Sequence, residues 1–152
     1  MELDKDFREF VGLLNDNRVK YLVVGGYSVA YHGFPRFTGD LDIWINPTLE
    51  NGSRMLIVLE KFGFGNMGFK ANDFMQVNKV IQFGVEPLRI DILTAVDGLE
   101  SFDEAFEKRN TSKLSSLKIN FIGYSDLIIN KKASNRLQDQ RDVEELSKVN
   151  KR

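Results

Sequence analysis

The chain of 152 residues contains no cysteine, three prolines, one histidine and one tryptophan. The lack of cysteine excludes disulfides and thiolate metal sites, and it is consistent with a reducing compartment. No apolar run reaches the roughly 18 residues that a membrane-spanning helix needs, and the opening MELDKDFREF is too charged for a secretory signal. We therefore expect a cytoplasmic protein that has no membrane partner.

A surplus of charge of one sign is also missing. The 21 Lys and Arg residues nearly balance the 22 Asp and Glu residues, so the formal net charge is −1 and no overall positive field favours nucleic acid. With 42% hydrophobic residues, the chain is long enough to bury a core as one domain. We expect a single domain over residues 1–152, with a core of about 19–122 and C-terminal helices of about 124–149.

The most informative segment begins with a strand and a glycine turn. Residues 20–24 predict a short buried strand, Gly25 and Gly26 allow a sharp turn, and residues 27–32 predict a short helix that Gly33 ends. A helix that starts after a glycine turn presents unpaired amides, which suit a phosphate. Taken alone, a glycine pair after a strand is most often only a turn.

Paired aspartates follow in a second strand, over residues 39–46. Alternation places Asp40 and Asp42 on one face, with their Cα atoms roughly 6.5 Å apart. The segment LRIDIL places Asp91 on one face of a later strand, where it can lie beside the pair. Three carboxylates in a chain without cysteine favour two Mg²⁺ or Mn²⁺ ions, about 3.5 to 4 Å apart as in phosphoryl and nucleotidyl transfer. A solvated edge remains the alternative for Asp-x-Asp alone.

The remaining pattern predicts an α+β fold, in which helices flank a mixed, twisted β-sheet and a short helical tail follows. Apolar spacing predicts a helix over 3–15, and Asn46 with Pro47 predicts the start of a helix that ends near Phe62. The glycine-rich residues 63–73 predict a loop. Further along, we expect strands at 78–84, 88–94 and 117–122, a turn at Glu86-Pro87, and helices at 102–109, from Asp126 behind a Ser125 cap, and at 137–148.

These motifs resemble the nucleotidyltransferases of the DNA polymerase beta superfamily, which combine a glycine turn, Asp-x-Asp on a second strand and a third Asp on a later one. Within the superfamily, the chain is most similar to small bacterial proteins related to the AbiEii toxin of toxin–antitoxin systems. The residues that carry this second likeness are His32, Gly33, Arg36, Thr38, Asp40, Leu41, Asp42, Asp91, Ile92, Leu93, Lys131, Arg136, Asp139 and Asp142.

The resemblance implies transfer of a nucleoside monophosphate from a nucleoside triphosphate to a hydroxyl acceptor. Asp40, Asp42 and Asp91 would hold the metal ions, and the acceptor would be a tRNA end, a protein side chain or a small molecule. The superfamily often has serine directly after the first glycine, where this chain has Gly26. Phosphate binding by backbone amides is therefore implied, with Ser28 as a possible substitute donor.

The sequence leaves two roles open for several residues. Arg36 clamps a phosphate or pairs with an acidic neighbour, and Lys131 reaches the triphosphate, as the resemblance suggests, or faces solvent. His32 is expected to bond a carbonyl rather than act as a base, and Thr38 to support the turn before Asp40. Arg136, Asp139 and Asp142 are expected to fix the C-terminal helices, and their interleaved charges indicate a solvated helix face.

A second hypothesis, from a different functional class, is that the chain is a non-catalytic module of a toxin–antitoxin-type system. Such a module would bind a nucleotide or a protein partner without turnover. The presence of all three aspartates argues against it. A dinucleotide-binding domain is excluded, because the glycine turn after the first strand does not follow G-x-G-x-x-G and the acidic residues arrive as a pair some fourteen positions on rather than singly at about twenty. A P-loop is excluded because G-x-x-x-x-G-K is absent.

Overall fold

The computed structural model describes residues 3–85 and 88–150, so the Glu86-Pro87 turn lies outside the described residues. Its helices are α1 (Lys5–Asp16), α2 (Gly25–Tyr31), α3 (Leu49–Phe62), the short 3₁₀ helix η1 (Ala71–Phe74), α4 (Phe102–Glu107), α5 (Tyr124–Ser134) and α6 (Leu137–Val149). Its strands are β1 (Tyr21–Val24), β2 (Asp40–Ile45), β3 (Val80–Val85), β4 (Leu88–Leu93), β5 (Asn110–Leu114) and β6 (Leu117–Phe121).

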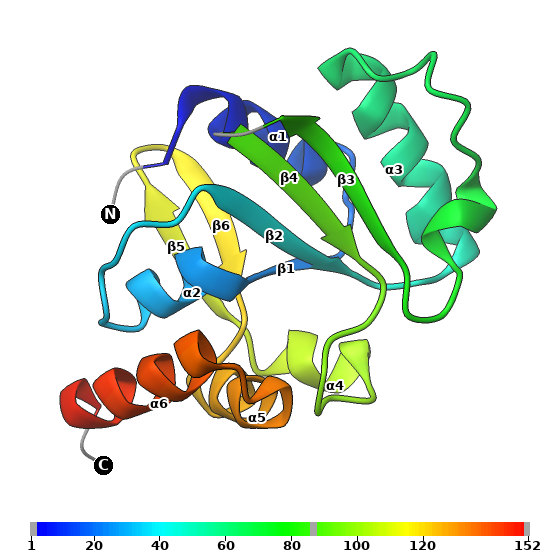
Figure 1. Cartoon of the computed structure of the whole chain (residues 1–152). Helices are drawn as coiled ribbons and strands as arrows, with labels where there is room; N and C mark the ends of the chain where they lie inside the picture. Colours follow the sequence, from blue (N-terminus) through cyan, green and yellow to red (C-terminus); the bar gives the residue numbers. More distant parts are fainter. Residues whose placement is uncertain (1–2, 86–87, 151–152) are drawn as a thin grey trace.

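The described strands form one six-stranded mixed sheet in the order β3-β4-β2-β1-β6-β5. The pairs β2–β4 and β1–β6 are parallel, whereas β1–β2, β3–β4 and β5–β6 are antiparallel. Helices flank this sheet, so the α+β fold predicted from the sequence is confirmed (Figure 1).

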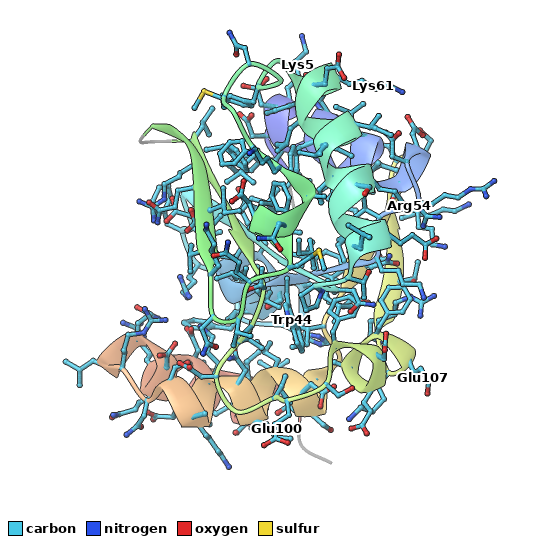
Figure 2. All side chains as sticks on the ribbon, turned by 90° about the vertical axis from the view of Figure 1, so that its right-hand side faces the viewer. Lys5, Trp44, Arg54, Lys61, Glu100 and Glu107 are labelled. Atoms are coloured by element: carbon cyan, nitrogen blue, oxygen red, sulfur yellow. The ribbon has the colours of Figure 1, made fainter. Side chains whose placement is uncertain are left out.

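Each face of the sheet buries its own hydrophobic cluster. Leu41, Ile43 and Ile45 of β2 pack on one face with α1 and α3, and this is the larger cluster. Trp44 points to the other face, where it packs at 5.2 Å against Phe102 in the cluster that also contains residues of α4, α5 and α6. Figure 2 shows Trp44 inside the molecule, between the sheet and these helices. The alternation of β2 therefore places Asp40 and Asp42 on the smaller cluster's face.

Four predicted helix starts and one predicted loop were wrong in detail. Helix α1 begins at Lys5 rather than at residue 3, and α2 begins at Gly25 rather than at residue 27, so the glycine pair forms the first turn of α2. Thr48 caps α3, because its Oγ1 accepts the Asn51 N–H at 3.2 Å, and Asn51 in turn bonds the Lys20 backbone. Helix α5 begins two residues earlier than predicted, behind Gly123 rather than Ser125. The predicted loop at 63–73 contains the start of η1, where the Asp73 carboxylate accepts the Lys70 N–H at 2.8 Å.

Strand β5 was not predicted at all. Its sequence, NTSKL, is polar, and it lies at the sheet edge with side chains that are mostly exposed. It joins β6 through a turn in which Ser115 takes a positive φ of 57°, without a glycine to signal it. Over residues 3–85 and 88–150, the helices are all too short or too polar to cross a membrane.

Candidate active site

The strand register brings the three predicted aspartates together. Strands β2 and β4 run parallel with Asp42 directly opposite Asp91, while Asp40 lies opposite Arg89. On the other side, Val24 at the end of β1 lies opposite Asp42, so the glycine turn that follows adjoins the same carboxylate. The carboxylates and the turn therefore meet where β1 ends and β2 and β4 begin.

The carboxylates carry more negative charge than their surroundings neutralise. Burial raises the pKa of Asp42 to about 7. The charge of Asp91, the hydrogen bond between the Asp42 and Asp91 carboxyl groups and the charge of Asp40 raise it further, whereas the charge of Lys131 lowers it. One oxygen of Asp40, Oδ1, is buried and has no hydrogen-bond partner. Neighbouring like charges repel one another, and a cation between them relieves the repulsion.

A guanidinium partly meets this need. Arg89 Nη2 lies 2.7 Å from Asp40 Oδ2, and Arg89 Nε lies 3.1 Å from Asp91 Oδ1. Within the described parts of the chain, no three Asp, Glu, His or Cys side chains are grouped ready to hold a metal ion. The donor set still fits Mg²⁺ or Mn²⁺, because all three side chains offer hard oxygens and Asp40 Oδ1 has no partner.

Packing explains why both residues of the turn are glycine. Gly25 has a φ of +66°, and a Cβ at this position would run into the Asp42 carboxylate. A Cβ on Gly26 would lie 2.7 Å from the Cβ of Thr38 and would also meet its hydroxyl. The Thr38 side chain thus takes the space that a serine at position 26 would occupy. Ser28 is buried and donates to the Gly25 carbonyl at 2.7 Å, so it supports the turn from behind.

The other predicted phosphate ligands belong to a buried ionic network. Arg36 donates to both oxygens of Asp142 at 2.9 and 3.0 Å, and Lys131 lies 3.0 Å from Asp139 and 3.1 Å from Asp142. Burial would raise the pKa of Asp142, but hydrogen bonds from Arg36, Gln138 and Lys131 hold it below its ordinary value. Arg36 therefore pairs with an acidic neighbour, which was one of the two roles predicted for it. Lys131 is buried and does not face solvent.

Asp139 is the second acid of this network. Burial opposes its charged form, but bonds from Arg136 and Lys131 lower its pKa as well. Arg136 Nε lies 2.9 Å from Asp139, and the network joins α5 to α6 and both to the loop that carries Arg36. The solvated helix face expected from the interleaved charges was wrong for Asp139 and Asp142, which are 1% and 0% exposed. His32 bonds the Ile122 carbonyl at 2.7 Å, as expected of a structural histidine.

Two cavities border the paired aspartates. The smaller, of about 340 Å³, is lined by the glycine turn, Arg36, Thr38 and the exposed Phe37. The larger, of about 680 Å³, extends along β3 and β4 to α5, where Gln82, Asn130 and Ser134 line it. Asp40, Asp42, Lys131, Arg136 and Asp139 border both cavities. Two ligands can therefore meet at the carboxylates.

Sequence reasoning gave no role to Arg89, and it gave Thr38 only that of supporting the turn before Asp40, where its hydroxyl lies 3.4 Å from the Asp40 carbonyl oxygen. The signal for Arg89 was present in LRIDIL, because the residue two positions before Asp91 shares its strand face. Thr38 lies twelve residues from Gly26 in the chain, and no local pattern reports that they touch.

Comparisons with known proteins agree with this architecture. The sequence matches, over residues 1–151, the family described as nucleotidyltransferase of unknown function (DUF6036). No curated protein matches it. The fold is similar to that of the lincosamide antibiotic adenylyltransferase LnuA in its lincomycin-bound structure, with a TM-score of 0.60 and 16% identity over 97% of this chain and 98% of that one.

A proposed nucleotidyltransferase from Thermotoga maritima is similar too, with a TM-score of 0.56 and 16% identity over 95% of this chain and 91% of that one. At these identities the structural likeness shows the fold, whereas the sequence match covers nearly the whole chain and shows the family. The chain belongs to the DUF6036 nucleotidyltransferases, and it is a transferase enzyme whose substrate is a nucleotide.

Proposed function

We propose that the enzyme transfers a nucleoside monophosphate from a nucleoside triphosphate to a hydroxyl group of an acceptor. The observation that carries this proposal is the register that sets Asp42 opposite Asp91, with Asp40 on the same face. Asp40, Asp42 and Asp91 would hold two Mg²⁺ or Mn²⁺ ions. When bound, the ions would supply Lewis-acid stabilisation of the phosphates and lower the pKa of the attacking hydroxyl.

The reaction then needs the protein mainly to position its substrates. The acceptor oxygen forms a bond to the α-phosphorus, the bond between that phosphorus and the oxygen bridging to the β-phosphorus breaks, and pyrophosphate leaves. Asp91 accepts the proton of the acceptor hydroxyl in this scheme. Its place in β4, at the border of the larger cavity, supports an acceptor that approaches from that side.

The triphosphate would occupy the smaller cavity. Backbone amides at Gly25 and Gly26 would contact it, and the Thr38 hydroxyl, which lies over Gly26, would donate in place of a side chain at that position. Ser28 would hold the turn. Arg36 and Lys131 line the same cavity and would add positive charge, which their bonds to Asp142 and Asp139 orient. Phe37, 88% exposed at this cavity, offers a face on which a base could stack.

The acceptor would be a small molecule rather than a tRNA or a protein. The larger cavity, of about 680 Å³, falls in the range of about 300–1,000 Å³ typical of small-ligand sites. The net charge of −1 gives no general attraction for RNA. The fold neighbour LnuA is described as an adenylyltransferase of a lincosamide antibiotic, which is a small-molecule acceptor.

Two broader assignments accompany this function. We infer kinship with the AbiEii-related enzymes from the His-Gly, Arg-x-Thr and Asp-Leu-Asp motifs, which leaves a toxin or antitoxin partner as a candidate interaction. We also propose that the chain is a single domain, because the network of Arg36, Lys131 and Asp142 ties its C-terminal helices to the core.

The deciding experiment incubates the protein with Mg²⁺ and each labelled nucleoside triphosphate. Parallel reactions contain total tRNA, cell lysate proteins, the enzyme alone or a small-metabolite extract, and mass spectrometry identifies whatever gains label. Label on a small molecule, absent with Asp42→Asn, is the expected result. Metal-dependent nucleotide binding without product in any arm would instead support the non-catalytic module.

A further inference from the structure

Arg89 occupies the place between two of the proposed metal ligands. It lies directly across from Asp40 in the β2–β4 register and two residues before Asp91, so all three side chains share one face of the sheet. Its Nη2 donates to Asp40 Oδ2 at 2.7 Å and reaches Asp91 Oδ2 at 3.4 Å, while its Nε donates to Asp91 Oδ1 at 3.1 Å. The guanidinium therefore bridges carboxylates from neighbouring strands.

A guanidinium and a divalent ion need the same oxygen lone pairs. Mg²⁺ binds carboxylate oxygens at about 2.0–2.1 Å, and an N–H donor that already points at an oxygen blocks that approach. The bonds from Arg89 engage Asp40 Oδ2 and both oxygens of Asp91, whereas Asp40 Oδ1 has no hydrogen-bond partner. Two of the three carboxylates are thus occupied by the protein's own cation.

Arg89 lies next to open space. Its side chain is 30% exposed and borders the larger cavity, so a turn about its side-chain bonds can carry the guanidinium into that space without opening the core. Asp40 is equally exposed, whereas Asp91 is 10% exposed. Removal of Arg89 from Asp91 without a replacement cation would leave a poorly hydrated carboxylate beside Asp42, which is unfavourable.

We propose that Arg89 is a built-in counter-ion that competes with the metal for Asp40 and Asp91, and that metal loading displaces it toward the acceptor cavity. This inference rests on the metal site of the proposed function. It makes Arg89 a positioning residue: it holds the two carboxylates together before loading, and it raises the metal concentration at which the site fills.

The test measures Mn²⁺ binding to the nucleotide-free protein by electron paramagnetic resonance and by calorimetry. Arg89→Gln removes the charge while keeping a side chain of similar length, and it is expected to bind Mn²⁺ about tenfold tighter, because the ion no longer displaces charge-assisted hydrogen bonds. Arg89→Lys keeps the positive charge but cannot bridge both carboxylates, so its Mn²⁺ affinity should lie between those of wild type and Arg89→Gln. Arg54→Gln, which breaks an exposed pair with Glu50, is the matched control and should bind as wild type.

A second measurement separates competition from a purely structural role. In EDTA, Arg89→Gln should melt below wild type, and a saturating concentration of Mn²⁺ should raise its melting temperature by more than it raises that of wild type. Equal Mn²⁺ affinity in wild type and Arg89→Gln, or weaker affinity in the variant, overturns the role of Arg89 and leaves the metal site standing. If neither protein binds Mn²⁺, even with a nucleoside triphosphate present, the metal site itself is wrong and this inference falls with it.

Discussion

Two groups of aspartates on the same face of the sheet have opposite electrostatic surroundings. Asp42, beside Asp40 and Asp91, has its pKa raised to about 7 by burial and by neighbouring carboxylates. Asp139 and Asp142 are at least as buried, yet their pKa values are lowered, because Lys131 and an arginine bond each of them. Asp42 and Asp139 border the same two cavities, so the contrast arises over a short distance.

This difference shows that Asp139 and Asp142 stabilise the fold, whereas the cluster of Asp40, Asp42 and Asp91 destabilises it. Buried acids that are paired and hydrogen-bonded contribute to stability, whereas neighbouring acids with too few cations cost stability. A cost of this kind is retained at sites where the charge has a use, and perturbed carboxylates in a cleft are typical of functional sites. The contrast therefore supports the three sheet aspartates as the catalytic group and the helical pair as scaffold.

Removal of one sheet carboxylate gives the largest expected effect on activity. Asp42→Asn should reduce transfer by roughly a thousandfold or more, since the metal-assisted stabilisation that it supports is worth several kcal/mol. Its melting temperature should equal or exceed that of wild type, because a neutral amide relieves the repulsion with Asp91. Labelled-product formation and a thermal melt measure both quantities, and retained activity would remove Asp42 from the catalytic group.

The matched change in the scaffold group should act on stability. Asp142→Asn leaves Arg36 and Lys131 with less compensation, and we expect a loss of about 3 kcal/mol in the free energy of unfolding, as for other broken buried pairs. Denaturant unfolding measures this loss. Glu144→Gln is the control, because the exposed pair of Glu144 with Lys148, at 3.7 Å, should contribute about 0.5 kcal/mol or less. A loss for Asp142→Asn no greater than that of the control would contradict the assignment.

Acidification should remove the same stabilisation without a mutation. Because the pKa values of Asp139 and Asp142 are lowered in the folded protein, their contribution is complete above the unfolded value of about 4 and is lost as the pH falls through the folded values. The stability difference between wild type and Asp142→Asn should stay constant from pH 7 to 5 and shrink below pH 4. Urea unfolding across this range measures it, and a gap that narrows between pH 7 and 5 would refute the lowered values.

The contrast also marks what the sequence was able to predict. Alternation along β2 and β4 located the sheet aspartates and their shared face, because strand periodicity is local. The fold class followed from the same kind of pattern. The scaffold group was harder: Arg36 and Asp142 lie 106 residues apart, and a pattern of interleaved charges looks the same whether it faces solvent or a buried partner.

Other misses have equally physical reasons. Strand β5 is polar and lies at the edge of the sheet, so its sequence lacks the apolar alternation that reports a strand. The N-cap of α3 is Thr48 rather than Asn46, because the Thr48 hydroxyl accepts the Asn51 N–H. The Asn51 side chain also ties the helix to Lys20, a contact that no spacing rule contains. Both errors concern contacts between residues that are distant in the sequence, and these contacts exist only once the sheet has assembled.

The smallest predicted effect tests whether the Thr38 hydroxyl, next to the glycine turn, binds the nucleoside triphosphate. Thr38→Val keeps the shape and removes the hydroxyl, so the KM for the nucleoside triphosphate should rise about tenfold, the value of one hydrogen bond to a charged group. The variant should melt as wild type does, since Thr38 makes only a 3.4 Å bond to the Asp40 carbonyl.

A swap of side chains at the two positions sharpens this test. Gly26→Ser alone should lose stability and nucleotide affinity, because its Cβ would lie 2.7 Å from the Thr38 Cβ. Adding Thr38→Gly removes that Cβ together with the hydroxyl, and the new serine supplies a hydroxyl from the other side, so the double variant should recover both properties, a non-additivity expected only of residues in contact. If the two substitutions instead add, Thr38 does not stand in for a side chain at position 26, and the phosphates are held by backbone amides and the oriented cations alone.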